Sequence, residues 1–197
     1  SKVHCCVIRD LDDPSEALSF RPHQIRDALK MLWGADEIWG HNIIGYDLPV
    51  IYKLYPEIGE HQGTVRDTLV LSRLCRANLV EEDANRGWTS DKFPKRHWGS
   101  HSLKAWGLRL GNHKGDYDGG WAEFSEEMLD YCVQDTSVTV SLAKEFSKAG
   151  FSEQCIELEH QLAAICLRIG SNGWTFDMEK ATALYAKLAQ RRGDLED

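Results

Sequence analysis

The chain has 197 residues, 42% of them hydrophobic, and a formal net charge of −8 at pH 7. This composition excludes a disordered or fibrous protein and allows one packed domain of about 150 residues with an additional segment. No apolar run approaches the roughly 20 residues that cross a bilayer, and the N-terminus has no secretory signal, so we expect a soluble chain with no membrane partner. Six scattered cysteines without a Cys-x-x-Cys pair predict reduced thiols and a cytoplasmic location.

The first forty residues alternate between strand and helix signals. A β-prone run at 3–8 is followed by a turn signal and a second run at 18–20, which predicts a hairpin. Apolar residues then recur at helical spacing from Ile25 and stop at Gly34, which predicts a helix. A third strand is expected at 37–40.

The middle of the chain continues this alternation. A helix is predicted at 48–54, with proline in its first turn, and a short strand at 65–68. A longer helix is expected at 69–79. Residues 80–100 are polar and rich in glycine, proline and charge, so they are expected to form a long loop.

Helices dominate the remainder. We expect one at 103–110 and another from about Ser125 to Phe146, whose first turn holds two glutamates that favour the positive end of the helix dipole. An amphipathic helix at 151–169, a turn at 170–173 and a helix from about Asp177 complete the chain. The last helix still continues at residue 197, which suggests a fragment of a longer protein. Strands followed by alternating helices predict an α/β or α+β layered domain.

Basic residues are concentrated in one region of this acidic chain. They are Arg86, Lys92, Lys95, Arg96, Lys104, Arg109 and Lys114. Nucleic-acid affinity comes largely from lysine and arginine that neutralise phosphates, so a local basic loop can compensate for net negative charge. The pattern fits a metal-dependent nuclease, and it fits an ordinary acidic cytosolic protein nearly as well.

Two short motifs place carboxylates where they could share a metal. They read His41-Asn42-x3-Tyr46-Asp47 and Tyr131-x3-Asp135. Asp47 lies where a strand passes into a helix, and Tyr131 and Asp135 are four residues apart on one face of a helix. Phosphodiester hydrolysis can use two divalent ions about 4 Å apart, held by hard oxygen ligands that suit Mg²⁺ or Mn²⁺. The phenol of Tyr131 could then orient the attacking water.

Each of these residues also has an ordinary structural interpretation. Asp47 could be a helix N-cap, and His41 a packed or surface histidine with Asn42 as a turn residue. Tyr131 and Asp135 could be a core aromatic and a surface acid. The conjunction of both motifs, in order and in fitting contexts, favours an exonuclease.

With these motifs, the chain resembles the proofreading domain of family A DNA polymerases from short-tailed phages of the T-seven type. The resemblance also includes residues 67–74, 99–111, 124–135 and 159–177. It implies an α/β, ribonuclease H-like (DnaQ-like exonuclease) fold for residues 1–150, with a mixed central sheet flanked by helices. Residues 151–197 would be a helical linker into the polymerase domain of the same parent chain. A first strand carrying Asp-x-Glu would lie upstream of Ser1.

The resemblance also implies roles for individual residues. Asp47 would bind the metal on the leaving-group side, Asp135 the metal that carries the nucleophile, and Tyr131 would orient the water. The predicted substrate-binding residues are His41, Asn42, Tyr46, Arg96 and Lys104, with Asn42 and Tyr46 at the terminal nucleotide. The basic 86–104 loop could contact single-stranded DNA, although a solvated surface segment is an equal alternative. Asp67 is expected to be structural, positioning a strand end.

The missing Asp-x-Glu motif is the main departure from this family. Asp10 and Asp12 follow a strand and mimic the motif, but the resemblance aligns 3–10 with the second strand of the fold, so we expect a weakened metal site in the chain as it stands. The expected partners are the 3′ end of single-stranded DNA and the polymerase domain, with a processivity factor binding outside this segment. A phage-encoded chain would act in the host cytoplasm. The alternatives are a stand-alone DEDD-type exonuclease acting on RNA and a non-catalytic nucleic-acid-binding module.

Overall fold

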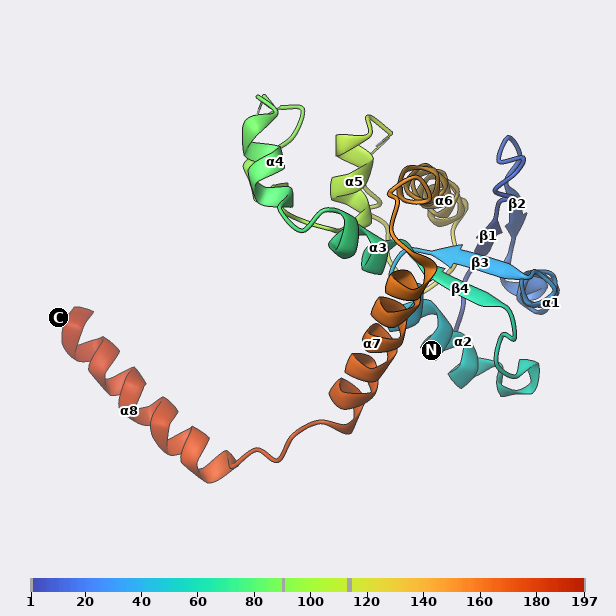
Figure 1. Ribbon diagram of the computed structural model, residues 1–197. Coiled ribbons are helices and arrows are strands. Elements are labelled where there is room, and N and C mark those ends of the chain that lie inside the picture. Colours follow the sequence, from blue (N-terminus) through green and yellow to red (C-terminus); the bar gives the residue numbers. More distant parts are fainter. Residues whose placement is uncertain (1, 90, 113–114, 197) are drawn as a thin grey trace. The chain divides into compact units, whose positions relative to one another are not determined.

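The computed structural model describes residues 2–89, 91–112 and 115–196, so Lys114 of the predicted basic region lies outside the described residues. The chain divides into two compact units, Ser1–Ala164 and Ile165–Asp197. Both α-helices and β-strands are present, and helices predominate (Figure 1). The predicted functional boundary after residue 150 stays a prediction. Among the residues that the structure describes, no helix combines the length and apolar character that a membrane span requires.

The N-terminal hairpin is confirmed. Strands β1 (Cys6–Ile8) and β2 (Leu18–Phe20) pair antiparallel, with Cys6 opposite Phe20 and Ile8 opposite Leu18. In the turn between them the Asp10 carboxylate accepts a hydrogen bond from the Asp12 backbone N–H at 2.8 Å. This local bond is typical of aspartate in turns and explains why the chain reverses here.

A parallel pair of strands forms the second sheet. Strands β3 (Glu37–Gly40) and β4 (Thr64–Asp67) run parallel, with Gly40 opposite Asp67. As predicted, α1 (Ile25–Trp33) precedes β3 and ends at Gly34. In the described residues the strands form these two separate pairs, and the single mixed central sheet of a ribonuclease H-like fold stays a prediction.

The connection from β3 to β4 is mostly helical. A π-helical turn, η2 (Ile43–Asp47), leads directly into α2 (Leu48–Leu54), which lies where the sequence predicts a helix. A short 3₁₀ turn, η3 (Pro56–Ile58), follows, and a similar turn, η1 (Pro22–Gln24), precedes α1. Ile38, Ile43 and Leu48 form a small buried cluster that fixes the π-helical turn against β3.

The helix predicted at 69–79 is confirmed up to Cys75 and is interrupted after it. Helix α3 (Thr68–Cys75) ends at Arg76, whose backbone leaves the helical region at φ −134° and ψ 56°. A separate helix, α4 (Leu79–Asn85), then occupies part of the predicted loop, and a 3₁₀ turn, η4 (Lys95–His97), occupies another part. The sequence suggested a loop because α4 has little apolar character; the side chains that it does bury are Leu79 and Asp83.

Helices α5 (Leu103–Arg109) and α6 (Glu126–Phe146) confirm the next two predictions. Each begins with a serine cap, since Ser102 accepts from the Ala105 N–H and Ser125 from the Met128 N–H. Helix α6 packs against β1, β3, α3 and α5. The main hydrophobic core between these helices consists of Leu71, Leu79, Trp106, Val138, Leu142 and Phe146.

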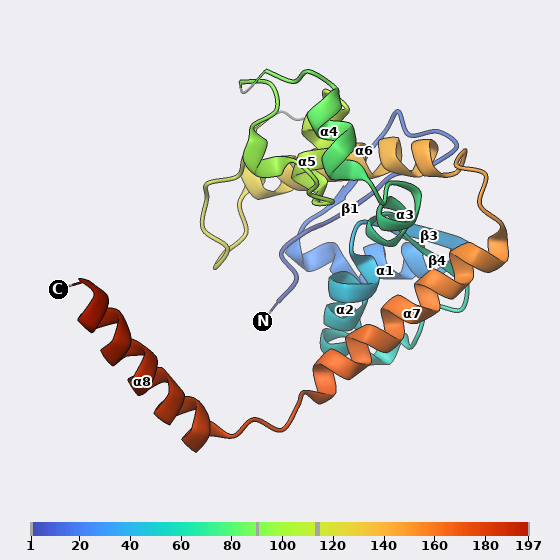
Figure 2. The same ribbon diagram turned by 60° about the vertical axis from the view of Figure 1, so that its left-hand side comes forward.

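Two helices end the chain. Helix α7 (Glu153–Asn172) runs through the turn predicted at 170–173 and ends at Gly173, whose φ is 69°. Helix α8 (Met178–Glu196) begins where the sequence predicts it. The first part of α7, up to Ala164, runs beside β4 in both views (Figures 1 and 2).

Candidate active site

Asp67, the last residue of β4, organises the backbone around the first motif. Its side chain is buried, with 1% of the residue exposed. One carboxylate oxygen accepts from the N–H groups of Asn42 at 2.8 Å and Leu69 at 2.9 Å, and the other accepts from the Ile44 N–H at 3.1 Å. The same carboxylate therefore caps α3 and holds the turn that follows β3. This confirms the structural role predicted for Asp67.

The turn that Asp67 holds is tightly wound. Asn42 adopts the left-handed conformation with φ 61°, and the Tyr46 N–H donates to the Asn42 carbonyl at 2.9 Å. A Cβ added at Gly45 would lie 2.5 Å from the Asn42 side-chain oxygen, so only glycine fits this close approach without a shift. Single π-helical turns of this kind are frequent at functional sites.

Tyr46 and Asp47 emerge from this turn at the surface, and both residues are exposed. Asp47 has helical backbone angles, φ −65° and ψ −50°, and its side chain makes no capping hydrogen bond. The N-cap interpretation of Asp47 is therefore wrong. Although solvent reaches the residue, surrounding protein raises the pKa of its carboxyl to about 6, a bond from its own backbone opposes the rise, and the charge of Asp67 adds to it.

His41 lies on the inner side of the same turn. Its Nδ1 is 2.9 Å from the Thr68 hydroxyl, which itself donates to the Gly40 carbonyl at 3.2 Å, so Nδ1 is the donor. Burial lowers the pKa of His41, partly opposed by the charge of Asp67. The structure thus makes His41 part of the packed support of the turn. Its predicted contact with substrate stays a prediction.

The second motif lies on α6 in an aromatic setting. The Tyr131 ring is 6.0 Å from Tyr117 and 6.5 Å from Trp121, and the latter two rings are 4.8 Å apart. Burial raises the pKa of Tyr131, and the charges of Asp135 and Asp116 add to the rise. Burial alone raises the pKa of Asp135 to about 6.

Cysteine side chains lie within the electrostatic influence of Asp47 and of Asp135. Burial raises the pKa of Cys6 on β1 to about 12, and the charges of Cys5 and Asp47 add to this. On α6, a hydrogen bond with Cys5 and burial raise the pKa of Cys132, with contributions from Cys6 and Asp135. Asp47 and Asp135 therefore act on the same group of thiols where β1 packs against α6.

The donor atoms fit a hard divalent cation in kind but not in number. Carboxylate oxygens are the ligands that Mg²⁺ and Mn²⁺ prefer. Within the described residues, however, no three His, Cys, Asp or Glu side chains are arranged to hold a metal ion. The Asp10 carboxylate is engaged in its own turn with the Asp12 N–H. Asp47 and Asp135 are thus two candidate ligands, and a complete site needs more.

A shallow surface pocket lies at Tyr46 of the first motif and includes residues that the sequence did not indicate. Its volume is about 560 Å³, and it is lined by Lys2, His4, Tyr46, Trp121 and Ala122. Tyr46 comes from the first motif, while Trp121 contacts Tyr131 of the second. The only hint in the sequence was the pair of aromatic residues within the glycine- and aspartate-rich segment before α6.

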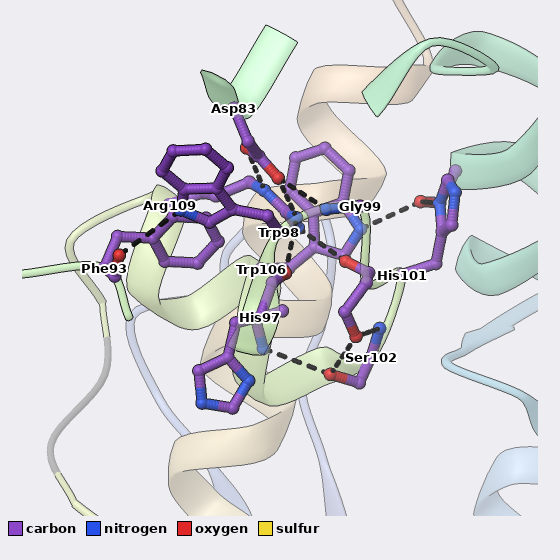
Figure 3. Close-up of polar contacts among 12 residues, drawn as sticks. Asp83, Phe93, His97, Trp98, Gly99, His101, Ser102, Trp106 and Arg109 are labelled. Atoms are coloured by element: carbon purple, nitrogen blue, oxygen red, sulfur yellow. Dashed lines mark hydrogen bonds and ion pairs between the residues drawn. The ribbon is translucent and has the colours of Figure 1, made fainter. Parts of the chain in front are cut away.

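Arg109, counted in the sequence among the basic residues of the region, is buried instead of available to phosphates. Its guanidinium makes two hydrogen bonds to Asp83, at 2.7 and 2.9 Å, and donates to the backbone carbonyls of Ser100 and His97 (Figure 3). It also stacks on the rings of Phe93 and Trp106, 4.9 and 5.0 Å from their centroids.

Asp83 completes this cluster by accepting from the Gly99 N–H at 2.8 Å. Burial works to raise the pKa of Asp83, but the bonds from Arg109 and Gly99 outweigh it and hold the pKa below its usual value. The cluster ties α4 and α5 to the segment between them. That segment carries Lys92, Lys95 and Arg96, which are exposed.

The two predicted DNA-contacting residues differ in their surroundings. Arg96 is exposed, and its Nε lies 3.3 Å from the His97 ring nitrogen. Lys104 forms an ion pair with Asp116 at 2.5 Å. Because the charge of Asp116 also acts on Tyr131, Lys104 approaches the second motif, whereas no contact joins Arg96 to either motif among the described residues.

Sequence comparison shows that the chain is homologous to DNA-directed DNA polymerases of phages. It is 33% identical to the enzyme of Escherichia phage T7 and 34% identical to that of Enterobacteria phage T3, in each case over 240 aligned residues. Each alignment covers 99% of this chain and 34% of the relative, so the chain spans about a third of the length of the curated relatives it matches. No protein-family model matches. The predicted resemblance is confirmed at the level of phage polymerases.

Proposed function

We propose that the chain is the 3′–5′ exonuclease portion of a phage-type DNA-directed DNA polymerase and removes nucleotides from the 3′ end of single-stranded DNA. The observation that carries this is the pair Asp47 and Asp135. Both carboxyls have a pKa raised to about 6; although they are 88 positions apart in the sequence, Asp47 acts on Cys6 and Asp135 on Cys132, and Cys6 in turn acts on Cys132. Perturbed carboxylates of this kind are characteristic of functional sites.

Asp47 and Asp135 would hold divalent metal, with further carboxylates from the parent chain completing the site. Bound Mg²⁺ or Mn²⁺ ions, two in the complete site, would activate water and stabilise charge on the leaving oxygen. Tyr131 lies one helical turn before Asp135, and its raised pKa keeps the phenol protonated at neutral pH. It can therefore donate a hydrogen bond that orients the attacking water.

The surface pocket would receive the terminal nucleotide. Tyr46 and Trp121 line the pocket, and stacking of a base on an aromatic ring contributes roughly 1–3 kcal/mol without sequence preference. Lys2 lies at the pocket as a cation for a phosphate, and the exposed basic side chains before α5 could follow the DNA backbone. Nucleotide selection by shape and stacking suits an enzyme that must accept every base.

The ribonuclease H-like fold belongs to the same proposal. One antiparallel and one parallel strand pair, packed with α6 in the same unit, support it as parts of a mixed sheet. Because the relatives extend well beyond the aligned region, we further propose a polymerase domain in the parent chain as partner. A processivity factor acting outside this segment stays a prediction.

The test is release of nucleoside 5′-monophosphates from a 3′-labelled single-stranded DNA in Mg²⁺, with the 197-residue chain and with the longest gene product that contains it. We expect Asp135→Asn to lower the rate at least about 100-fold, because metal catalysis contributes several kcal/mol. Asp130→Asn, an exposed acid on the same helix, is the matched control and should leave the rate unchanged. Release that survives Asp135→Asn in the longer protein would refute the proposal.

A second candidate is a non-catalytic nucleic-acid-binding module. The observation that favours it is the lack of a third metal ligand within the described residues. It predicts binding of single-stranded DNA with strong salt dependence but no release of nucleotides from either protein. A stand-alone exonuclease acting on RNA would instead degrade a 3′-labelled RNA faster than the matching DNA.

A further inference from the structure

His160, on the first part of α7, makes two hydrogen bonds that define the state of its ring. The residue is 5% exposed. Its Nε2 accepts from the backbone N–H of Asp67 at 2.8 Å, and its Nδ1 lies 2.8 Å from the Ile156 carbonyl oxygen, which can only accept. The ring is therefore neutral, with its proton on Nδ1.

His160 thus accepts a hydrogen bond from Asp67, the residue that organises the candidate site. On its carboxylate side, Asp67 holds the N–H groups of Asn42 and Ile44. The turn held in this way continues directly into Tyr46 and Asp47. A short series of bonds thus connects α7 to a candidate metal ligand: His160 fixes the backbone of Asp67, and Asp67 fixes the turn.

A second contact joins α7 to the same strand. Arg66, one residue before Asp67, forms an ion pair with Glu37 of β3 at 2.9 Å and another with Glu153 at the start of α7. The Arg66 side chain is 11% exposed, whereas its partners Glu37 and Glu153 are 41% and 69% exposed. The end of β4 is therefore held from its outer side by two side-chain contacts with α7, through adjacent residues.

We propose that His160 is a positioning residue for the candidate active site, acting through Asp67 to fix the turn that presents Asp47. Its catalytic meaning rests on the proposed function; the positioning itself does not. Without an acceptor at Nε2, the Asp67 N–H would be left buried and unsatisfied, and a strand end relaxes to regain such a bond. The carboxylate would move with its backbone and loosen its bonds to Asn42 and Ile44.

Two substitutions at residue 160 distinguish whether an acceptor remains at the position of Nε2. In His160→Gln the side-chain oxygen can reach the place of Nε2 and accept from Asp67. In His160→Asn the side chain is shorter and ends near the place of Nδ1, so it cannot reach. Gln161→Ala is the matched control, since Gln161 is the next residue, is exposed and, among the residues that the structure describes, makes its side-chain hydrogen bond within α7, to Glu157.

The experiment measures amide hydrogen exchange by NMR in the metal-free 197-residue chain. We expect exchange at Asn42 and Ile44 to be at least about 10-fold faster in His160→Asn than in the wild type and to return to within about 2-fold in His160→Gln. The Gln161→Ala variant should match the wild type, and the Leu142 amide in the core should change less than about 2-fold in all three. If His160→Asn does not fold, wild-type protection of Asn42 and Ile44 in His160→Gln supports the proposal.

Three results would overturn the positioning role. The first is unchanged protection of Asn42 and Ile44 in folded His160→Asn, and the second is loss of that protection in folded His160→Gln. The third is equal acceleration of exchange at all amides, which would mean that His160 contributes only to global stability. In the nuclease assay, kcat should fall about 10-fold in His160→Asn with KM unchanged and recover in His160→Gln. If the longest gene product that contains the chain releases no nucleotide, the exonuclease proposal fails, while the exchange data still decide the positioning role.

Discussion

The carboxylate of Asp83 and the carboxylates of Asp47 and Asp135 lie in contrasting surroundings, which shift their pKa values in opposite directions. Asp83 is 1% exposed and meets a guanidinium and a backbone N–H, which hold its pKa low. Asp47 and Asp135 have a pKa near 6, and among the described residues no other side chain donates a hydrogen bond to either of them. The first region is a completed ion pair, whereas the second holds two carboxyls whose pKa is raised mainly by burial.

The difference separates structural from functional acids. A buried carboxylate with a full set of donors stabilises a fixed geometry, here the junction of α4 and α5. A carboxylate that protein desolvates without compensation costs stability, and such costs concentrate where function requires them. Asp67 belongs with Asp83, because three backbone N–H groups satisfy it.

The largest expected effect is on the completed ion pair. Arg109→Ala should lower the free energy of unfolding by about 3–5 kcal/mol, because it leaves Asp83 buried without its partner and removes the stacking on Phe93 and Trp106. Urea denaturation followed by circular dichroism measures this. Lys92→Ala, an exposed cation in the same region, should stay within about 0.5 kcal/mol of the wild type. A loss below about 1 kcal/mol for Arg109→Ala would break the contrast between the two regions.

A smaller effect is expected for Asp135→Asn, which should raise the free energy of unfolding when metal is removed with EDTA. The pKa of Asp135 rises from its ordinary 3.8 to about 6 on folding, so the folded state binds more protons between these values and loses stability as pH rises through this window. Asp135→Asn removes this loss and should stabilise the protein by about 1 kcal/mol at pH 7.5, after allowance for partial exposure.

The free energy of unfolding, measured by urea denaturation at pH 4, is the internal control. There the wild-type Asp135 is largely protonated in the folded state, so Asp135→Asn and the wild type should have similar stability. Subtracting the stability curve of Asp135→Asn from that of the wild type, each measured against pH, removes the contributions of His41 and His101. The lowered pKa values of these histidines act in the opposite direction. If Asp135→Asn were less stable than the wild type at pH 7.5, the burial cost of the ionised Asp135 carboxylate would already be offset by interactions in the folded protein.

Local sequence signals predicted most elements of the fold. The β1–β2 hairpin, β3, α2 and α6 follow hydrophobic periodicity and the turn residues that bound them. The break at Arg76 and the presence of α4 did not follow, because α4 is buried through Leu79 in the main core and through the pairing of Asp83 with Arg109, 26 residues away. Contacts of that separation leave no periodic signal in the sequence.

The candidate site was predictable only in part for the same reason. The two motifs pointed to Asp47, Tyr131 and Asp135, and the position of Asp67 at a strand end indicated its structural role. The sequence placed His160 in a segment that resembles the family but did not indicate its bond to Asp67, which joins residues 93 positions apart. Trp121 likewise becomes relevant only when the fold brings it to Tyr131 and to the pocket that holds Tyr46.

Binding of Mn²⁺ tests most directly whether Asp47 and Asp135 form one metal site. Isothermal titration at pH 6.0 should show binding to the wild type with release of protons, because carboxyls with a pKa near 6 must ionise to coordinate a metal. Asp47→Asn and Asp135→Asn should each weaken binding at least about 10-fold and reduce the proton release, whereas Asp130→Asn should do neither. Equal affinity and equal proton release in all four proteins would contradict a shared site.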